Sequence, residues 1–363
     1  MTPLAKRIAA LIASAGPMSV ADYMALCLLD PTQGYYTTRE PFGREGDFTT
    51  APEISQMFGE LVGVWVVSAW RAIGSPTAVT VAEIGPGRGT LMRDVLRTLQ
   101  QLAPALSESA GFALVEASPR LAERQRGTLA SAKADLSWHA GIDTLPARPL
   151  IVLGNEIFDA LPFRQFVLTQ AGWRERMIGL NEDGRLAFAT GVATIEHARL
   201  PAKGAGALLG SVFEIAPARA ALMQALAERI SDHDGAGLFF DYGHTQAGFG
   251  DTFQAVRRHE PEHVLASPGE ADLTSHVDFA DLAGTAKAEG LSAQTTTQGD
   301  FLIAMGMLER AGRLGAALDA AGRERISGEV ERLAGPTEMG QLFKVLGVAR
   351  PGTPLAGFGT AGQ

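Results

Sequence analysis

A carboxylate stands just ahead of three closely spaced glycines in the segment EIGPGRG, residues 83–89. Glycines between a strand and a helix let backbone N–H groups and the helix N-terminus approach a ligand closely. A nicotinamide-type dinucleotide site would instead show Gly-x-Gly-x-x-Gly, with an acid about 20 residues further on. Here the glycines are Gly85, Gly87 and Gly89, and Glu83 would repel a pyrophosphate. A ligand with ammonium and sulfonium cations suits this carboxylate, so the pattern favours S-adenosylmethionine (SAM), with a purely structural turn as the alternative.

Further polar and aromatic side chains follow the neighbouring predicted strands. Glu116 ends the next strand, where an acid can bind both ribose hydroxyls as it does in dinucleotide sites. Trp138 and His139 end a later strand and could flank an adenine, although a packed aromatic beside a surface histidine explains them equally well. Asn155 ends the strand after that. We expect these four residues to line the cofactor site together with Glu83 and the three glycines.

These side chains must be positioned by alternating strands and helices. Apolar runs predict strands at 79–83, 112–116, 137–139 and 150–155, with helices at 91–102 and 119–129. A helix ending near 230, a strand at 237–241, a helix at 278–289 and closing strands near 292–297 and 341–348 follow. This order predicts an α/β fold with a doubly wound, mostly parallel sheet.

Two parts of the chain depart from this rhythm. Residues 1–75 are predicted to form helices and loops, with a helix capped by Ser19 and an apolar helix, 54–70, opened by a capping box at Thr50. Residues 165–215 are predicted to form a β-rich meander. We therefore expect an N-terminal extension, 1–75, that forms part of an active-site cap, and a SAM-binding domain, 76–363, that carries the meander. The loop 34–48, rich in glycine and aromatic residues, is expected to act with the meander as a lid.

Composition excludes several functional classes. The 363 residues carry a net charge of −9, and no strongly basic face indicates nucleic-acid binding. No apolar run approaches the length of a membrane span. The one cysteine, Cys27, lies in an apolar run, which predicts a buried thiol, excludes a cysteine-rich zinc site and indicates a reducing compartment.

The segment HEPEH, residues 259–263, matches the zinc-protease pattern His-Glu-x-x-His. That pattern works only on a helix, which brings both histidines to one face. Pro261 would break the helix at its centre. We therefore predict a loop here and no metal site.

The chain resembles the MidA family of class I SAM-dependent methyltransferases, whose mitochondrial members are complex I assembly arginine methyltransferases. The resemblance covers nearly the whole chain and rests on long ordered strings. They are GPMSVADYM (16–24), DPTQGYY (30–36), GDFTTAPEISQ (46–56), EIGPGRGTL (83–91), GNEIFDALP (154–162), DYGH (241–244), PGEADLTSHVDF (268–279) and QGDFL (298–302). The first predicted helix contains residues 8–15 and stops at Gly16-Pro17. Because the family pattern already begins within this helix, the resemblance implies a bacterial, cytoplasmic member without a presequence, with a Rossmann-like fold.

The resemblance also implies that the methyl acceptor is an arginine of a protein, linked in the relatives to a respiratory complex I subunit. A guanidinium is always protonated, so carboxylates must hold and orient it. Glu156 and Asp159 follow the fourth strand, and on one helical turn they would share a face. His244, predicted to lie just after the fifth strand, could accept the proton that is released. We assign these three as catalytic, with structural roles as the alternative.

Two other functions stay open at this point. One is a SAM-dependent methyltransferase of a small molecule, which the shared fold permits. The other is a SAM-binding assembly factor in which catalysis is secondary. The glycine-rich N-terminal loops and the meander favour a macromolecular acceptor.

Overall fold

The computed structural model describes residues 1–39, 49–201 and 206–359, and the chain divides into two compact units. Unit 1 comprises Met1–Phe48, Phe158–Ala221 and Gln246–His276, and unit 2 comprises Thr49–Ile157, Leu222–Thr245 and Val277–Gln363. The first segment of unit 1 therefore ends near residue 48, whereas the sequence predicts an N-terminal extension that ends at residue 75. The difference arises because the helix after residue 55 packs in the core of unit 2.

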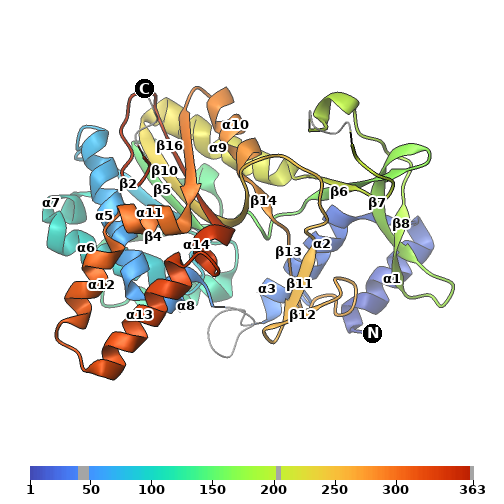
Figure 1. The fold of residues 1–363 in the computed structure, drawn as a ribbon, viewed down its shortest axis with the longest axis horizontal. Coiled ribbons are helices and arrows are strands. Elements are labelled where there is room, and N and C mark those ends of the chain that lie inside the picture. Colours follow the sequence, from blue (N-terminus) through green and yellow to red (C-terminus); the bar gives the residue numbers. More distant parts are fainter. Residues whose placement is uncertain (40–48, 202–205, 360–363) are drawn as a thin grey trace. The chain divides into compact units, whose positions relative to one another are not determined.

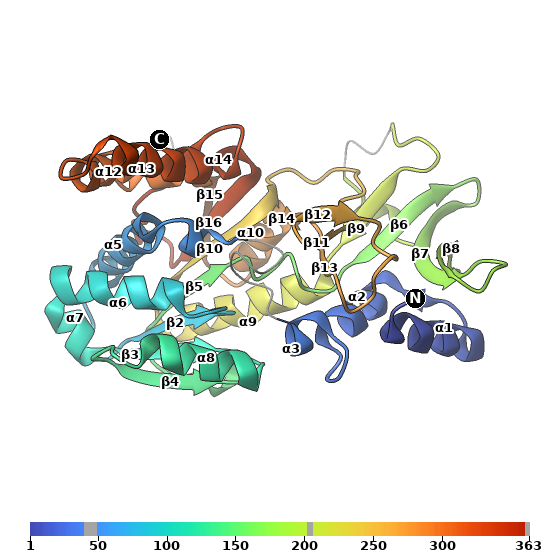
Figure 2. The same cartoon turned by 90° about the horizontal axis from the view of Figure 1, so that it is seen from below.

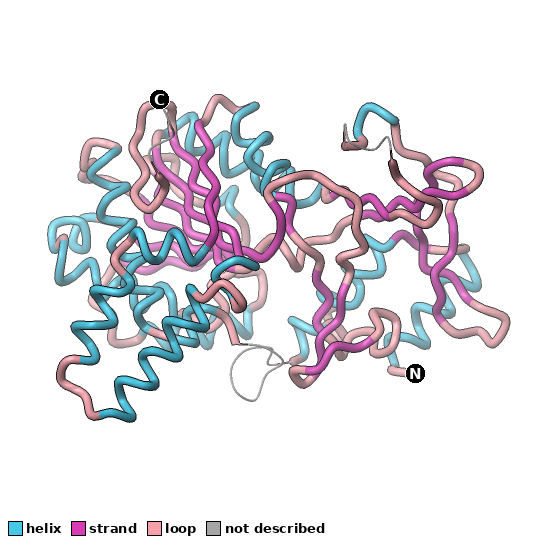
Figure 3. Tube along the Cα trace, viewed as in Figure 1, coloured by secondary structure: helices cyan, strands magenta, loops and turns pink. Residues whose placement is uncertain are grey.

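Unit 2 is built around one mixed sheet with the strand order β15-β16-β10-β5-β2-β3-β4, and β14 pairs with β10. β10, β5, β2, β3 and β4 run parallel, and β16 pairs antiparallel with both of its neighbours, β10 and β15. The strands lie side by side in Figure 3. The predicted doubly wound, mostly parallel α/β fold is confirmed. The strands are β2 (Thr80–Ile84), β3 (Gly111–Val115), β4 (Asp135–His139), β5 (Leu150–Asn155), β10 (Gly235–His244), β14 (Val277–Asp278), β15 (Ser292–Thr297) and β16 (Phe343–Ala349).

Helices cover both faces of this sheet. Figure 1 shows α5 and α6 on one side of β5, β10 and β16, and α10 on the other. Trp65 of α5 is fully buried in the core that α5 and α6 share with alternate strand residues such as Ile151 and Leu153. The helices are α4 (Ala51–Ile54), α5 (Gln56–Ala72), α6 (Thr90–Leu102), α7 (Pro104–Ser109), α8 (Pro119–Leu129), η1 (Ile142–Thr144), α10 (Phe279–Ala288), α11 (Gln298–Ala304), α12 (Met307–Gly315), α13 (Ala320–Ala334) and α14 (Met339–Leu342).

The four helices between β15 and β16 were not anticipated from the sequence. α11 to α14 pack on one another and on α4 and α5. Figure 2 shows α12, α13 and α14 side by side near the C-terminus. Leu302, Ile326 and Leu333 bury their side chains in the same core as α5. α9 (Pro217–His233) begins in unit 1 and continues in unit 2.

The predicted helix 54–70 is interrupted, and the predicted capping box at Thr50 is wrong. Thr50 precedes α4 but makes no side-chain cap hydrogen bond. Ser55 is extended (φ −153°, ψ 138°), which ends α4, and its hydroxyl accepts from the backbone N–H of Met57 to cap α5. The same hydroxyl donates to Glu329 Oε2 at 2.6 Å, so the break between the helices is fixed from α13.

Unit 1 contains a five-stranded antiparallel sheet, β1-β7-β6-β9 with β8 on β7, so the predicted meander is confirmed. Ser19 caps α2 as predicted, accepting from the backbone N–H of Asp22 at 3.0 Å. Tyr23, Tyr35 and Phe163 are buried in the hydrophobic core of unit 1. The elements are α1 (Pro3–Ala15), β1 (Met18–Ser19), α2 (Val20–Leu29), α3 (Tyr35–Thr38), β6 (Arg164–Thr169), β7 (Gly172–Leu180), β8 (Leu186–Thr190), η2 (His197–Arg199) and β9 (Val212–Ile215).

The segment 242–277, predicted as a loop, holds a second sheet of three strands, β12-β11-β13. They are β11 (Gln254–Arg257), β12 (Glu260–Glu262) and β13 (Asp272–Thr274). A two-residue turn, Arg258–His259, joins β11 to β12 with both residues at positive φ (54° and 63°). This backbone usually demands Asn or Gly, so the hairpin carried no sequence signal. The HEPEH segment thus lies on a turn and a strand, and no helix brings its histidines to one face.

Three other expectations concern the whole chain. No helix in the described residues is both long and apolar enough to cross a membrane. Cys27 is buried in the core of unit 1, and burial raises the pKa of its thiol to about 12. Residues 40–48, which make up most of the loop in the predicted lid, lie outside the described residues.

Candidate active site

The glycine turn has the backbone that its composition suggested. Gly85, Gly87 and Gly89 have φ of +61°, +51° and +79°, a left-handed region that other residues rarely adopt. Gly89 is the N-cap of α6, so the turn delivers the chain into a helix N-terminus. A Cβ at Gly85 would also lie 3.1 Å from Ile157 Cγ2. The turn can therefore offer bare backbone to a ligand only with glycine at these positions.

Glu83, on β2 just before the turn, is a buried carboxyl group. Its side chain is 3% exposed, and burial raises its pKa to about 8, opposed in part by a hydrogen bond from the backbone of Met92. Its Oε2 atom has no hydrogen-bond partner. A buried carboxyl with an unused oxygen is costly unless a cation or donor joins it. This atom fits the ammonium of SAM.

Glu116 is tied to the glycine turn through a residue that sequence reasoning missed. Gln125 of α8, with no exposed surface, donates from Nε2 to Glu116 Oε2 (3.1 Å) and to the carbonyl oxygen of Gly87 (3.0 Å). Its Oε1 accepts from the indole N–H of Trp138 at 3.1 Å. The signal was a glutamine in the buried stripe of α8, between Leu121 and Leu129. Gln125 therefore joins three predicted cofactor-site residues in one network.

Trp138 and His139 differ in how they are engaged. The Trp138 ring lies 4.7 Å from the guanidinium carbon of Arg126, a cation–π contact. His139 has Thr144 Oγ1 near Nδ1 at 2.9 Å and Ser137 Oγ near Nε2 at 3.0 Å. Both imidazole nitrogens are thus already occupied by neighbouring hydroxyls. A role for either residue at an adenine stays a prediction.

Asn155 and Glu156 lie at the carboxyl end of β5. Asn155 Nδ2 donates to Glu156 Oε1 at 2.9 Å, and Asn155 Oδ1 is buried with no hydrogen-bond partner. Glu156 has φ +55°, and its backbone N–H donates to the carbonyl oxygen of Phe240 at 2.8 Å. Left-handed glutamate is strained, and such strain concentrates at functional sites.

The expectation that Glu156 and Asp159 share a helical turn is wrong. The left-handed backbone at Glu156 stops any helix from starting there, and residues 156–160 form a bend followed by a turn. Asp159 belongs to unit 1, where it is 6% exposed. Its Oδ1 accepts from the N–H of Ala160 at 2.8 Å.

His244 lies within β10, which runs three residues beyond the predicted strand end. The extension occurs because β14 pairs with it, bringing His244 opposite Asp278. His244 Nδ1 is 3.9 Å from Asp278 Oδ1 and makes no hydrogen bond. Asp278 itself caps α10 by accepting from the backbone of Ala280 and Asp281. The Nδ1 atom therefore faces a carboxylate without a hydrogen bond to it.

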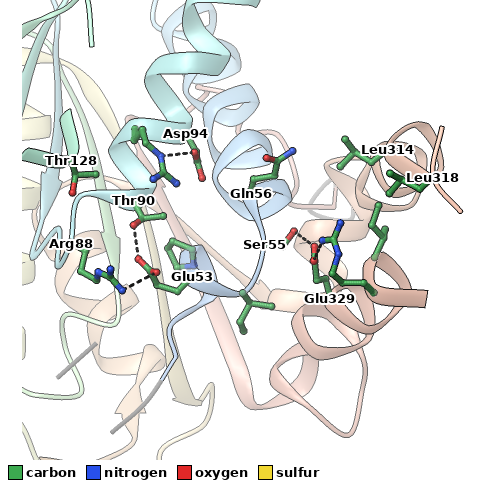
Figure 4. Close-up of a pocket in the computed structure, with 15 residues that line it drawn as sticks. Glu53, Ser55, Gln56, Arg88, Thr90, Asp94, Thr128, Leu314, Leu318 and Glu329 are labelled. Atoms are coloured by element: carbon green, nitrogen blue, oxygen red, sulfur yellow. Dashed lines mark hydrogen bonds and ion pairs between the residues drawn. The ribbon is translucent and has the colours of Figure 1, made fainter. Parts of the chain in front are cut away.

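A cavity of about 540 Å³ opens beside the glycine turn (Figure 4). Glu53 of α4 accepts from Thr90 Oγ1 at 2.5 Å and pairs with Arg88 at 3.5 Å. These contacts tie α4 to the turn and to the first residue of α6. The GDFTTAPEISQ string thus contributes Glu53 to the support of the turn, a role that the sequence did not reveal.

Comparisons with known proteins agree with this geometry. A family described as "Putative S-adenosyl-L-methionine-dependent methyltransferase" matches residues 61–297. The mitochondrial protein arginine methyltransferase NDUFAF7 of Danio rerio is 35% identical, over 95% of this chain and 87% of its own length. The Drosophila melanogaster homologue is 37% identical, over 94% and 84%. A crystal structure of a Burkholderia thailandensis protein bound to S-adenosyl-homocysteine superposes with a TM-score of 0.86 at 30% identity, covering 99% of this chain and 95% of that one.

Proposed function

The chain belongs to this family of SAM-dependent methyltransferases, and we propose that it methylates arginine side chains of a protein. The enzyme class and the SAM cofactor follow from the family. The arginine acceptor is supported by the 35% identity, over nearly the whole chain, to a relative that is named as a protein arginine methyltransferase. This identity is the observation that carries the proposal.

The residues around the glycine turn fit SAM. Its ammonium would lie at the unpartnered Glu83 Oε2, and the positive-φ glycines would leave room for backbone contacts. Glu116, held by Gln125, would accept from the ribose hydroxyls. Bound SAM supplies a methyl group on a sulfonium, an electrophilic carbon.

Three side chains would handle the acceptor. Glu156 and Asp159 would hold and orient the guanidinium, so that one nitrogen faces the methyl carbon. As the N–C bond forms, the methyl–sulfur bond breaks, and the product guanidinium sheds one proton. His244 would accept that proton, which an imidazole can do near neutral pH.

The partner and the location belong to the same proposal. A protein substrate is supported by the names of the relatives, and a respiratory complex I-type subunit is the candidate that the family resemblance suggests. The net charge of −9 disfavours a nucleic-acid acceptor. The buried Cys27 thiol is compatible with a cytoplasmic, reducing location.

The test is incubation of the purified protein with methyl-radiolabelled SAM and a lysate of a strain that lacks the protein. We expect a labelled protein band whose digest carries methyl groups on arginine by mass spectrometry. Label confined to small molecules would support the small-molecule alternative. The absence of any label, with SAM bound, would support the assembly factor, and methyl groups only on other residues would defeat the arginine assignment.

A further inference from the structure

Arg219 is a buried cation near the N-terminus of a helix, a position that disfavours positive charge. It is the third residue of α9 and is 3% exposed. The first turn of a helix carries partial positive charge, which disfavours arginine there. Burial adds a desolvation cost. Hydrogen bonds to the guanidinium must offset both costs.

The Arg219 guanidinium bonds two separate segments of unit 1. Its Nη1 donates to the carbonyl oxygen of His276 at 2.6 Å. Its Nη2 donates to the carbonyl of Asp159 (3.1 Å) and to the carbonyl and hydroxyl of Ser275 (3.3 and 2.5 Å). The guanidinium also lies over the ring of Phe163, 5.7 Å from its centroid. One planar group therefore joins the turn at 159 to the segment 275–276.

The backbone of Asp159 is held a second time from the same segment. The N–H of Ser275 donates to the Asp159 carbonyl at 3.2 Å. On the side-chain side, burial raises the pKa of Tyr36, and the charges of Asp272 and Asp159 add to that effect. Tyr36 stays protonated and donates to Asp272 Oδ1 at 2.9 Å. The Asp159 carboxyl group therefore lies near Tyr36 and accepts from the N–H of the Asp159–Ala160 peptide, whose carbonyl oxygen is held by Arg219 and Ser275.

We propose that Arg219 is a positioning residue, which fixes the peptide of Asp159 so that its carboxylate meets the methyl acceptor in one orientation. This inference rests on the proposed function, in which Asp159 holds the acceptor. It assigns the Arg219 guanidinium to acceptor recognition and not to SAM binding, whose candidate residues lie in unit 2.

The variant Arg219→Lys keeps the charge but replaces a planar fork of donors by one ammonium. We expect kcat/KM for the acceptor to fall about ten- to a hundredfold, because small misplacements of an orienting group cost that much. The Kd for SAM should stay within about twofold of wild type. Initial rates of label transfer, measured over a dilution series of the lysate, and calorimetry with SAM measure the two quantities.

Arg229→Lys is the matched control. Arg229 lies on the same helix and also donates to backbone carbonyls, those of Leu145 and Pro146, both at 2.8 Å. These hydrogen bonds go to residues 145 and 146, and not to Asp159 or to the segment 275–276. Equal losses of activity in the two lysine variants would overturn the proposal, because they would show a general effect of loosening α9.

A double-mutant cycle distinguishes the positioning role of Arg219 from the proposed function on which it rests. If Arg219 acts through Asp159, Arg219→Lys should cost little in an Asp159→Asn background. Additive losses, or a fully active Arg219→Lys beside an inactive Asp159→Asn, would overturn the role of Arg219 alone. A fully active Asp159→Asn would defeat the acceptor role of Asp159, and positioning through it. Methyl groups found only on other residues would defeat the arginine acceptor, while the cycle would still report on Arg219.

Discussion

The side-chain amide of Gln125 donates a 3.0 Å hydrogen bond to the carbonyl oxygen of Gly87, and so ties α8 to the middle of the glycine turn. The same amide group bonds Glu116, and the Gln125 carbonyl oxygen accepts from Trp138. Because Gln125 has no exposed surface, water cannot easily replace these bonds. The shape of the turn and the orientation of the predicted ribose acid therefore depend on one side chain.

The first prediction is that Gln125→Leu weakens both the fold and SAM binding. Leucine fills a similar volume but leaves polar groups of Gly87, Glu116 and Trp138 without their partner. Each buried unsatisfied group costs about 1–3 kcal/mol, and relaxation should keep the total near the low end. We expect SAM affinity to fall at least tenfold by calorimetry. Trp138→Phe, which removes the indole N–H bond but keeps an aromatic ring beside Arg126, should show a smaller loss, and equal affinities for wild type and Gln125→Leu would contradict the network.

The second prediction concerns pH and Glu83. With a folded pKa of about 8, above its usual value of 4.5, Glu83 is mostly protonated at pH 7. Between these values the folded chain holds a proton that the unfolded chain has lost, so stability contributed by this group falls as pH rises through the window. A cation at Glu83 favours the ionised form. SAM binding should therefore release a proton near pH 7, and affinity should rise up to about tenfold per pH unit until pH 8.

Calorimetry at pH 7 in two buffers of different ionisation enthalpy measures this proton directly. Glu83→Gln should abolish the release that is due to this group and weaken binding. Burial also raises the pKa of Glu116, so the variant is needed to assign the proton. Proton release that is the same in wild type and Glu83→Gln would place the cation elsewhere.

The third prediction tests whether SAM binding requires glycine at position 85. Gly85→Ala adds a Cβ at φ +61°, 3.1 Å from Ile157 Cγ2, and should weaken SAM binding at least tenfold while the chain stays folded. Gly184→Ala is its control, since Gly184 has a similar φ of +70° with nothing within 4 Å of the added Cβ. Both should lose the stability that the strained backbone costs, and Gly85→Ala somewhat more because of its contact with Ile157, but Gly184→Ala should bind SAM normally. Weakened binding in both would mean that strain, and not the turn's contact with a ligand, explains the loss.

The central sheet was predictable because its signals are local. Strand β5 begins and ends at the predicted residues, 150 and 155, since a run of large apolar residues can only be buried between helices. The glycine turn was predictable because left-handed backbone demands glycine. Glu116 was placed by its position at a strand end, and its link to the turn agrees with that placement.

What the sequence did not reveal depends on contacts distant in the chain, or on residues that break local rules. Apolar periodicity predicts one continuous helix, but Ser55 interrupts it. The Ser55 hydroxyl donates a hydrogen bond to Glu329, 274 residues later in the chain. Arg258 and His259 form a turn that normally needs Asn or Gly. Glu156 likewise adopts a backbone that glutamate avoids, so its helical turn with Asp159 could not form. Such violations are expected to gather at functional sites.

The last prediction uses the left-handed backbone of Glu156 to separate the effect of its side chain on function from its effect on stability. Glycine adopts φ +55° without strain, so Glu156→Gly should change the free energy of unfolding by no more than about 1 kcal/mol, in either direction. Methyl transfer should nevertheless fall by orders of magnitude, because a carboxylate that orients the acceptor is gone. The Kd for SAM should stay near wild type. Ser75→Gly is the control, with the same backbone relief at φ +54° in the same unit, and it should keep full activity.

Label transfer, calorimetry with SAM and thermal unfolding on Glu156→Gly, Glu156→Gln and Ser75→Gly decide the matter together. If Glu156→Gln and Glu156→Gly are both inactive with normal SAM affinity, the carboxylate itself acts on the acceptor. Should Glu156→Gln bind SAM weakly yet turn over normally at saturating SAM, Glu156 is a cofactor residue, and its link to Asn155 becomes the reason for its strained backbone. Full activity in Glu156→Gln together with loss in Glu156→Gly would mean that the left-handed backbone, made rigid by a side chain, matters and the charge does not.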